Sequence, residues 1–209
     1  SDPSLNEIHF KKPIYPIGEE LTRYLVSHAR SVPLPIAYND LLRHDGLMAQ
    51  RDAEGKETLW TTVMLKPSEM EDTHERLVDL YQLLVADGRR LPYLAVASID
   101  FCAYGNSQPF RIKILNQIND NHDYYYIKKA DASRVYGLEL EHMLSPNKIN
   151  YAVHGNTLVE EHIIGVPGDD FIKDPEHYGG NFNPVRLCKE FVKFNERCFV
   201  RLLGDMRAY

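Results

Sequence analysis

The fold is constrained most strongly by a series of strand-like segments between residues 92 and 164. Two segments rich in β-branched and aromatic residues, LPYLAVASIDFCAY and FRIKILNQI, flank GNSQP, whose glycine, asparagine, serine and proline favour a tight turn. Three later segments, YYYIKKAD, INYAVHG and TLVEEHIIG, have a similar strand-like composition. We therefore predict a five-stranded antiparallel sheet over residues 93–164.

A helical segment interrupts this series of strands. ASRVYGLELEHML lies between the third and fourth strand-like segments and is followed by SPNK, which predicts a helix over residues 131–144. A longer helix begins after Asn183, an N-cap residue, has Pro184 at its first position, and ends at Gly204. The predicted fold class is α+β: an antiparallel sheet with one inserted helix, followed by a long helix.

The first 90 residues favour helices. GEELTRYLVSHARS and KPSEMEDTHERLVDLYQLLVADG have apolar residues at helical spacing, and YNDLLRHDGLMAQ predicts a shorter helix broken near Gly46. In this region TLWTTVML alone is typical of a strand. We predict three parts: a mainly helical accessory region (1–90), the sheet with its helix (91–166), and a linker with the long helix (167–209).

Composition excludes several classes of protein. Of the 209 residues, 44% are hydrophobic and 26% are charged, which is typical of a soluble globular domain. The net charge of −6 argues against a general nucleic-acid binder. The three scattered cysteines favour a reducing compartment. The N-terminal segment SDPSLNEIHFKK lacks the apolar core of a signal peptide. The sequence contains no run of 18 apolar residues, so it predicts no membrane helix. We therefore expect a cytoplasmic protein with neither nucleic-acid nor membrane partners.

The order of the elements points to a known family. Residues 92–209 begin with two strands joined by a tight turn, a third strand that ends in lysine, and a helix with glutamates. Two more strands, a linker, a long helix and Gly-Asp follow. This order resembles the protein-kinase-like fold, nearest the small-molecule branch that includes the aminoglycoside and choline phosphotransferases. The resemblance implies a kinase-like small lobe in 91–166 and the linker and first part of the large lobe in 167–209. It also implies an ATP-dependent phosphotransferase that uses ATP and magnesium, with an unidentified small-molecule or protein acceptor.

A lysine and a glutamate match the phosphate-binding pair of this family. The segment YYYIKK takes the place of the apolar strand that ends in a phosphate-binding lysine. Strand alternation puts Lys128 and Lys129 on opposite faces, and we predict that Lys128 faces the nucleotide. The resemblance implies a partner for it on the following helix, Glu139 or Glu141, and Glu139 is preferred because Met143 follows four residues later. Two solvated lysines at a strand end are the alternative.

Two turn segments match the rest of the nucleotide site. CAYGNSQPF takes the place of the glycine-rich loop, although it holds a single glycine, and HIIGVPGDD takes the place of the linker that contacts adenine. An ordinary hairpin turn and an ordinary Gly-Pro turn are the alternatives. The residues that the resemblance assigns to nucleotide binding in these segments are Gly105, Asn106, Ser107, His162, Ile163 and Ile164.

The chain's last segment, RLLGDMRAY, supplies the expected catalytic base. In the small-molecule kinases a His-Gly-Asp follows the long helix, and its aspartate accepts the proton of the attacking hydroxyl. Asp205 takes this place, with Leu203 where the family has histidine. The magnesium-binding asparagine would fall at position 210, so we expect the metal ligands beyond Tyr209. The alternative is a helix that stops at Gly204, with Asp205 facing water.

Two further classes of function remain open. A catalytically inactive pseudokinase or a protein-interaction module would use the same scaffold, and Leu203 and the single-glycine loop favour it. An unrelated α+β binding domain would carry these matches by accident. The nine histidines show no His-x-x-x-His spacing and the cysteines no Cys-x-x-Cys, so we predict no histidine or cysteine metal site.

Overall fold

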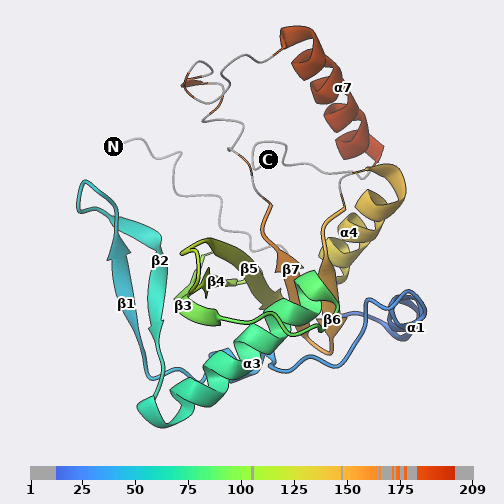
Figure 1. The fold of residues 1–209 in the computed structure, drawn as a ribbon. Coiled ribbons are helices and arrows are strands. Elements are labelled where there is room, and N and C mark those ends of the chain that lie inside the picture. The colour runs from blue at the N-terminus through green and yellow to red at the C-terminus, as the bar shows by residue number, and fades with distance from the viewer. Residues whose placement is uncertain are drawn as a thin grey trace. The chain divides into compact units, whose positions relative to one another are not determined.

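The computed structural model describes residues 13–104, 106–146, 148–163, 165, 171, 173–174, 177 and 183–200, drawn as a ribbon in Figure 1. The chain divides into two units, residues 1–162 and 163–209. Residues on both sides of position 90 lie in the first unit, where they contribute strands to one sheet.

The first unit is built on a seven-stranded sheet in which every neighbouring pair is antiparallel. The α+β class is as predicted, but the predicted count of five strands is wrong, because two strands from the first 90 residues extend the sheet. The order across the sheet is β1-β2-β3-β4-β5-β7-β6. The strands are β1 Gly46–Arg51, β2 Glu57–Met64, β3 Leu94–Phe101, β4 Phe110–Asn116, β5 His122–Lys129, β6 Tyr151–His154 and β7 Thr157–Glu161.

The hairpin of β1 and β2 corrects the helix predicted for YNDLLRHDGLMAQ. Its helical part is limited to α2, Tyr38–Leu41, and the segment from Gly46 onward pairs with β2 instead. The turn of the hairpin is fixed by Asp52, whose Oδ1 accepts from the backbone N–H groups of Glu54 at 3.1 Å and Lys56 at 2.8 Å. Pairing with β2 therefore overrides the helical preference of the segment.

Three longer helices complete the first unit: α1 Glu19–Ser27, α3 Pro67–Ala86 and α4 Ala132–Leu144 (Figure 1). Helix α4 lies between β5 and β6 in the chain, where a helix over residues 131–144 was predicted. Its N-cap is Asp131, whose Oδ1 accepts from the N–H groups of Ser133 at 3.4 Å and Tyr15 at 3.0 Å. The same carboxylate thus caps the helix and holds the chain segment at Tyr15 beside it.

The two faces of the sheet carry separate hydrophobic clusters. Ile127 pairs with Val159, and both belong to the cluster beneath α2 and α3. One position further along, Lys128 pairs with Leu158, and Leu158 belongs to the cluster with α1 and α4. Because register partners share a face and neighbours along a strand alternate, α3 and α4 cover opposite faces. Lys128 therefore lies on the α4 face.

The second unit contains α7, Pro184–Val200. It begins as predicted, with the Asn183 side chain accepting from the N–H groups of Val185 at 3.0 Å and Arg186 at 3.1 Å. The predicted catalytic segment at 201–209 lies outside the described residues. Among the helices of the described residues, none has both the length and the apolar character needed to cross a membrane.

Candidate functional site

A row of side chains crosses the α4 face of the sheet from β2 to β6. Each member is the register partner of the next, so all of them share this face. The row begins beside the β1–β2 hairpin and ends under α4. Its members, in order across the sheet, are Thr62, Asp100, Arg111, Tyr126, Glu160 and Tyr151.

A cluster of three charged side chains forms where this row meets α4. The ammonium of Lys128 on β5 forms an ion pair with Oε1 of Glu160 on β7. Arg134 on α4 donates from Nε to Oε2 of Glu160 at 3.0 Å and from Nη2 to Oε1 at 3.1 Å. The Glu160 side chain is only 4% exposed and that of Lys128 is 19% exposed. We call Lys128, Arg134 and Glu160 the charged cluster; it holds two cations around one buried carboxylate.

The pKa values of the cluster reflect the excess of two cations over one carboxylate. Burial alone would raise the pKa of Glu160, but the charges and hydrogen bonds of Lys128 and Arg134 outweigh it and hold the pKa below its usual value. Burial lowers the pKa of Lys128, the attraction of Glu160 opposes this, and repulsion by Arg134 adds to it, so the pKa stays lowered. The carboxylate is fully compensated, whereas the positive charge of Lys128 is compensated only in part.

The predicted pairing of Lys128 with Glu139 is wrong. Strand β7 lies beside β5, and Glu160 sits diagonally opposite Lys128, within reach of a lysine side chain. The α4 residue that faces this cluster is Arg134, and Glu139 lies one and a half turns further along the helix. Glu141, the other predicted partner, is half-buried on the same helix.

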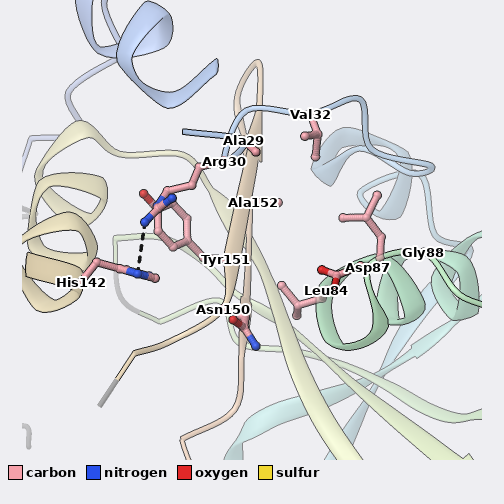
Figure 2. A pocket seen from close by; sticks show the side chains of 11 residues that line it. Ala29, Arg30, Val32, Leu84, Asp87, Gly88, His142, Asn150, Tyr151 and Ala152 are labelled. Carbon is pink, nitrogen blue, oxygen red and sulfur yellow. Dashed lines mark hydrogen bonds between the residues drawn. The ribbon is translucent and has the colours of Figure 1, made fainter. Parts of the chain in front are cut away.

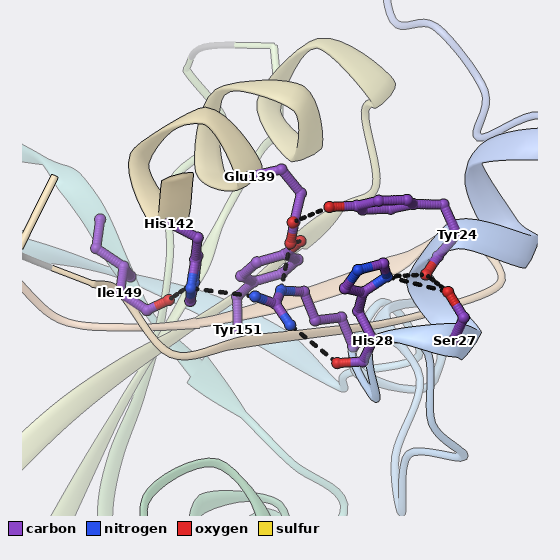
Figure 3. Close-up of polar contacts among 8 residues, drawn as sticks. Tyr24, Ser27, His28, Glu139, His142, Ile149 and Tyr151 are labelled. Carbon is purple, nitrogen blue, oxygen red and sulfur yellow. Dashed lines mark hydrogen bonds and ion pairs between the residues drawn. The ribbon is translucent and has the colours of Figure 1, made fainter. Parts of the chain in front are cut away.

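Glu139 instead holds α1 against α4 and β6 (Figure 3). Its carboxylate accepts from the hydroxyls of Tyr24, at 2.9 Å, and Tyr151, and it forms an ion pair with Arg30. Burial raises the pKa of Tyr151, and its hydrogen bond to Glu139 raises it further, so the phenol stays protonated as a donor. Tyr24 and Arg30 come from more than 100 residues before Glu139, so this cluster acts as a clamp between distant segments.

A cavity of about 390 Å³ lies beside this clamp (Figure 2). His142 faces it, and Nε2 of His142 lies 2.9 Å from the carbonyl oxygen of Ile149, which can only accept. Nδ1 is then free to accept from Nη2 of Arg30 at 3.2 Å. The imidazole of His142 thus orients Arg30 toward Glu139, which supports a structural role for these side chains.

An aromatic surface extends from the charged cluster toward β2. Arg111 is fixed by two hydrogen bonds to Asp100, from Nε at 3.0 Å and Nη2 at 2.8 Å. Its guanidinium carbon lies 4.3 Å from the ring centre of Trp60 and 5.5 Å from that of Tyr124. These rings are half-buried, so part of each is accessible. The aromatic surface is defined by Trp60, Arg111, Tyr124, Tyr126 and His162.

Of the residues predicted to bind the nucleotide in the two turn segments, those that the structure describes lie near opposite ends of β5. Ser107, in the β3–β4 loop with Asn106, accepts from the N–H of Lys129 at 3.2 Å, which places the loop at the Lys128 end of β5. His162 follows β7 at the other end, where its Nδ1 lies 3.1 Å from the hydroxyl of Tyr126. Ile163 is exposed. Three predicted residues, Gly105, Ile164 and Asp205, lie outside the described residues.

Several residues of the site were not singled out from the sequence: Glu160, Arg134, Arg111 and Trp60. The segment HDYYYIKK places aromatic and basic residues on one strand, which is the one signal in the sequence for this surface. The residues that contact them could not be found, because they depend on the order of the strands in the sheet. Within the described part of the chain, no three histidine, cysteine, aspartate or glutamate side chains group closely enough to hold a metal ion.

Comparison with known proteins found no match to a protein-family model, to a curated protein or to a solved structure.

Proposed function

We propose that the chain is an ATP-dependent phosphotransferase of the protein-kinase-like type, whose nucleotide lies on the α4 face of the sheet. The observation that carries the proposal is the surplus positive charge of the charged cluster. Lys128 and Arg134 share one carboxylate, Glu160, and Lys128 keeps a lowered pKa because it is buried and only partly compensated. An anion beside Lys128 would complete the charge balance.

The elements around Lys128 support phosphate as that anion. The β3–β4 loop, with Asn106 and Ser107, lies at the same end of β5 as Lys128. Asn and Ser side chains carry N–H and O–H donors that can bind phosphate oxygens, as the backbone N–H groups of glycine-rich loops do. Glu160 replaces the helix glutamate as the residue that holds the lysine, and Arg134 couples it to α4.

The aromatic surface supports a purine base at the other end of the site. Tyr124 lies four residues from Lys128 on β5, a separation of roughly 13 Å along the strand. An extended nucleoside triphosphate spans such a distance. His162, whose ring contacts Tyr124 and Tyr126, lies where the resemblance assigns the adenine contact.

Magnesium would neutralise charge on the phosphates. Within residues 1–209 the expected contributions are positioning of the phosphates by Lys128 and acceptance of the acceptor's proton by Asp205. The proposal therefore rests on nucleotide binding by the first unit, and this binding can be measured directly.

The proposal is tested by titrating the chain with ATP, with and without magnesium, in a calorimeter. Lys128→Met removes the cation and is expected to weaken binding by roughly 10- to 100-fold, the value of a hydrogen bond to a charged group. Lys129→Met is the matched control, because Lys129 lies on the opposite face and donates to Gln108 Oε1 at 2.7 Å. Equal loss in both variants would contradict the assignment of Lys128.

The same titration separates the other classes of function. Saturable ATP binding without transfer of phosphate to any acceptor would support an inactive relative on the same scaffold. Absence of ATP binding by the folded wild-type chain would reject the phosphotransferase proposal in favour of a protein-interaction module on the same scaffold or an unrelated α+β binding domain.

A further inference from the structure

Strand β3 has an edge that its neighbour covers only in part. It pairs with β4 along its whole length, from Leu94 to Phe101. On the other side it pairs with β2 only at Asp100 and Phe101. Among the described residues, no strand pairs with residues 94–98 on that side. A stretch of five residues therefore presents the backbone groups that a further strand would use.

A groove lies beside this edge. A cavity of about 570 Å³ is lined by the side of α3 that includes Val78 and Asp79 and by residues 90–96. Val78, Leu94 and Val96 form an apolar floor, since they pack against the core under the sheet. The end of the groove is fixed by the buried Gln82, whose Oε1 accepts from the N–H of Leu91 at 2.6 Å. The groove is thus preformed, with an apolar base and an open strand edge as one wall.

The other wall is acidic. Helix α3 carries five carboxylates and one arginine, a net charge of −4 with His74 neutral, out of −6 for the whole chain. Burial lowers the pKa of His74, which keeps it neutral at pH 7. Glu75 and Asp79 line the groove four residues apart, on the same side of the helix, and both are exposed. Arg90 is the one cation among the lining residues.

We propose that this groove binds an extended basic segment of a partner protein, which adds to β3 as a further strand. The backbone of residues 94–97 would supply hydrogen bonds, and alternate lysine or arginine side chains would reach Glu75 and Asp79. The occupant is basic because the helix wall is acidic, and extended because the strand edge accepts only a strand. The site lies apart from the charged cluster and does not depend on nucleotide binding.

The experiment uses a fluorescent peptide of alternating lysine and valine, and its binding to the full chain is followed by anisotropy at low salt. A peptide with N-methyl groups on alternate residues keeps the charge but cannot form a ladder. Glu75→Gln with Asp79→Asn removes two charges from the groove, and Glu19→Gln with Glu20→Gln removes two from α1 as the control. Hydrogen exchange of the amides of residues 94–97 is measured with and without peptide.

We expect saturable binding, slower exchange at residues 94–97, and loss of binding by the methylated peptide. The groove variant is expected to bind roughly 3- to 10-fold more weakly, from two partly exposed ion pairs, and the α1 variant to bind like wild type. Equal weakening in both variants, or equal binding of the methylated peptide, would overturn the proposal in favour of general attraction to an acidic protein. A concentration-dependent dimer with residues 94–97 protected in the absence of peptide would overturn it in favour of a second copy of the chain.

Discussion

Replacing Glu160 with glutamine tests the charged cluster through stability. Glutamine keeps the size of the side chain but removes the charge and presents an N–H to one of the two cations. Loss of one partner from a buried ion pair costs about 3–5 kcal/mol, because the remaining charge stays buried. Arg134 is 36% exposed, so solvent screens its share, and we expect the lower end, about 3 kcal/mol. For a domain of this size the melting temperature would fall by roughly 6–12 °C.

Urea unfolding followed by tryptophan fluorescence measures this change directly. Trp60 is the chain's only tryptophan, and it lies in the same unit and on the same face as the cluster. Glu161→Gln is the matched control, because Glu161 is the next residue and bonds the N–H of Asn150 at 2.8 Å in an exposed position. We expect a loss below about 1 kcal/mol for the control. A loss of that size for Glu160→Gln as well would refute the buried cluster.

The pH dependence of the same pair of proteins gives an independent check. The pKa of Glu160 is lower in the folded chain than its usual value of 4.5, which applies to the unfolded chain. Its stabilisation is therefore complete above about pH 4.5 and is lost as the pH falls through the lower, folded value. The difference in stability between wild type and Glu160→Gln should be constant from pH 5 to pH 7 and should shrink below pH 4.5. A difference that grows on acidification would contradict the sign of the pKa shift.

Three further changes have defined outcomes. Arg111→Lys keeps the charge but loses the double hydrogen bond to Asp100 and the stacking on Trp60, so unfolding in urea should show a loss of about 1–2 kcal/mol and the emission of Trp60 should shift. Glu139→Gln weakens the clamp and should lower the free energy of unfolding by about 2–4 kcal/mol, so that proteolysis releases α1 faster. An unchanged rate of proteolysis would argue against the clamp. Asp205→Asn should lower phosphoryl transfer by roughly 10²- to 10⁴-fold with nearly unchanged ATP affinity, as judged by turnover and calorimetry.

Elements with local signals could be predicted from the sequence. In β4, the buried Phe110, Ile112 and Ile114 alternate with Arg111 and Lys113, and FRIKILNQI was predicted as a strand. The helix over 131–144 was identified by its apolar spacing and by the SPNK segment that follows it. These signals are contained in about ten residues of sequence each, and the structure did not alter them.

Strand β1 shows where local signals fail. GLMAQR contains leucine, methionine, alanine, glutamine and arginine, all good helix formers, so its intrinsic preference favours a helix. The segment is extended because the Asp52 turn brings it beside β2. The predicted count of five strands was wrong partly for this reason, since tertiary pairing decides the conformation of such a segment. The other added strand, β2, was predicted as a strand from TLWTTVML but was not assigned to the sheet.

The partner of Lys128 could not be predicted because it depends on strand order. The chain passes through α4 and β6 before β7, yet β7 is the strand that pairs with β5. Only this crossover brings Glu160 beside Tyr126 and within reach of Lys128. Glu139 was preferred because Met143 follows it by four residues, whereas its actual partners include Tyr24 and Arg30, which come from α1 and the segment after it.

The central claim, that the phosphates of ATP lie beside Lys128, is tested most directly by chemical labelling. An ATP derivative with an acyl group on its γ-phosphate transfers that group to a nearby lysine amine, which forms an amide and releases ATP. The lowered pKa of Lys128 favours the free amine that this reaction needs. Mass spectrometry should find the acyl group on Lys128, and excess ATP should prevent its transfer. Labelling of Lys129 or other lysines with Lys128 unmodified, or labelling of Lys128 that ATP does not reduce, would contradict the claim.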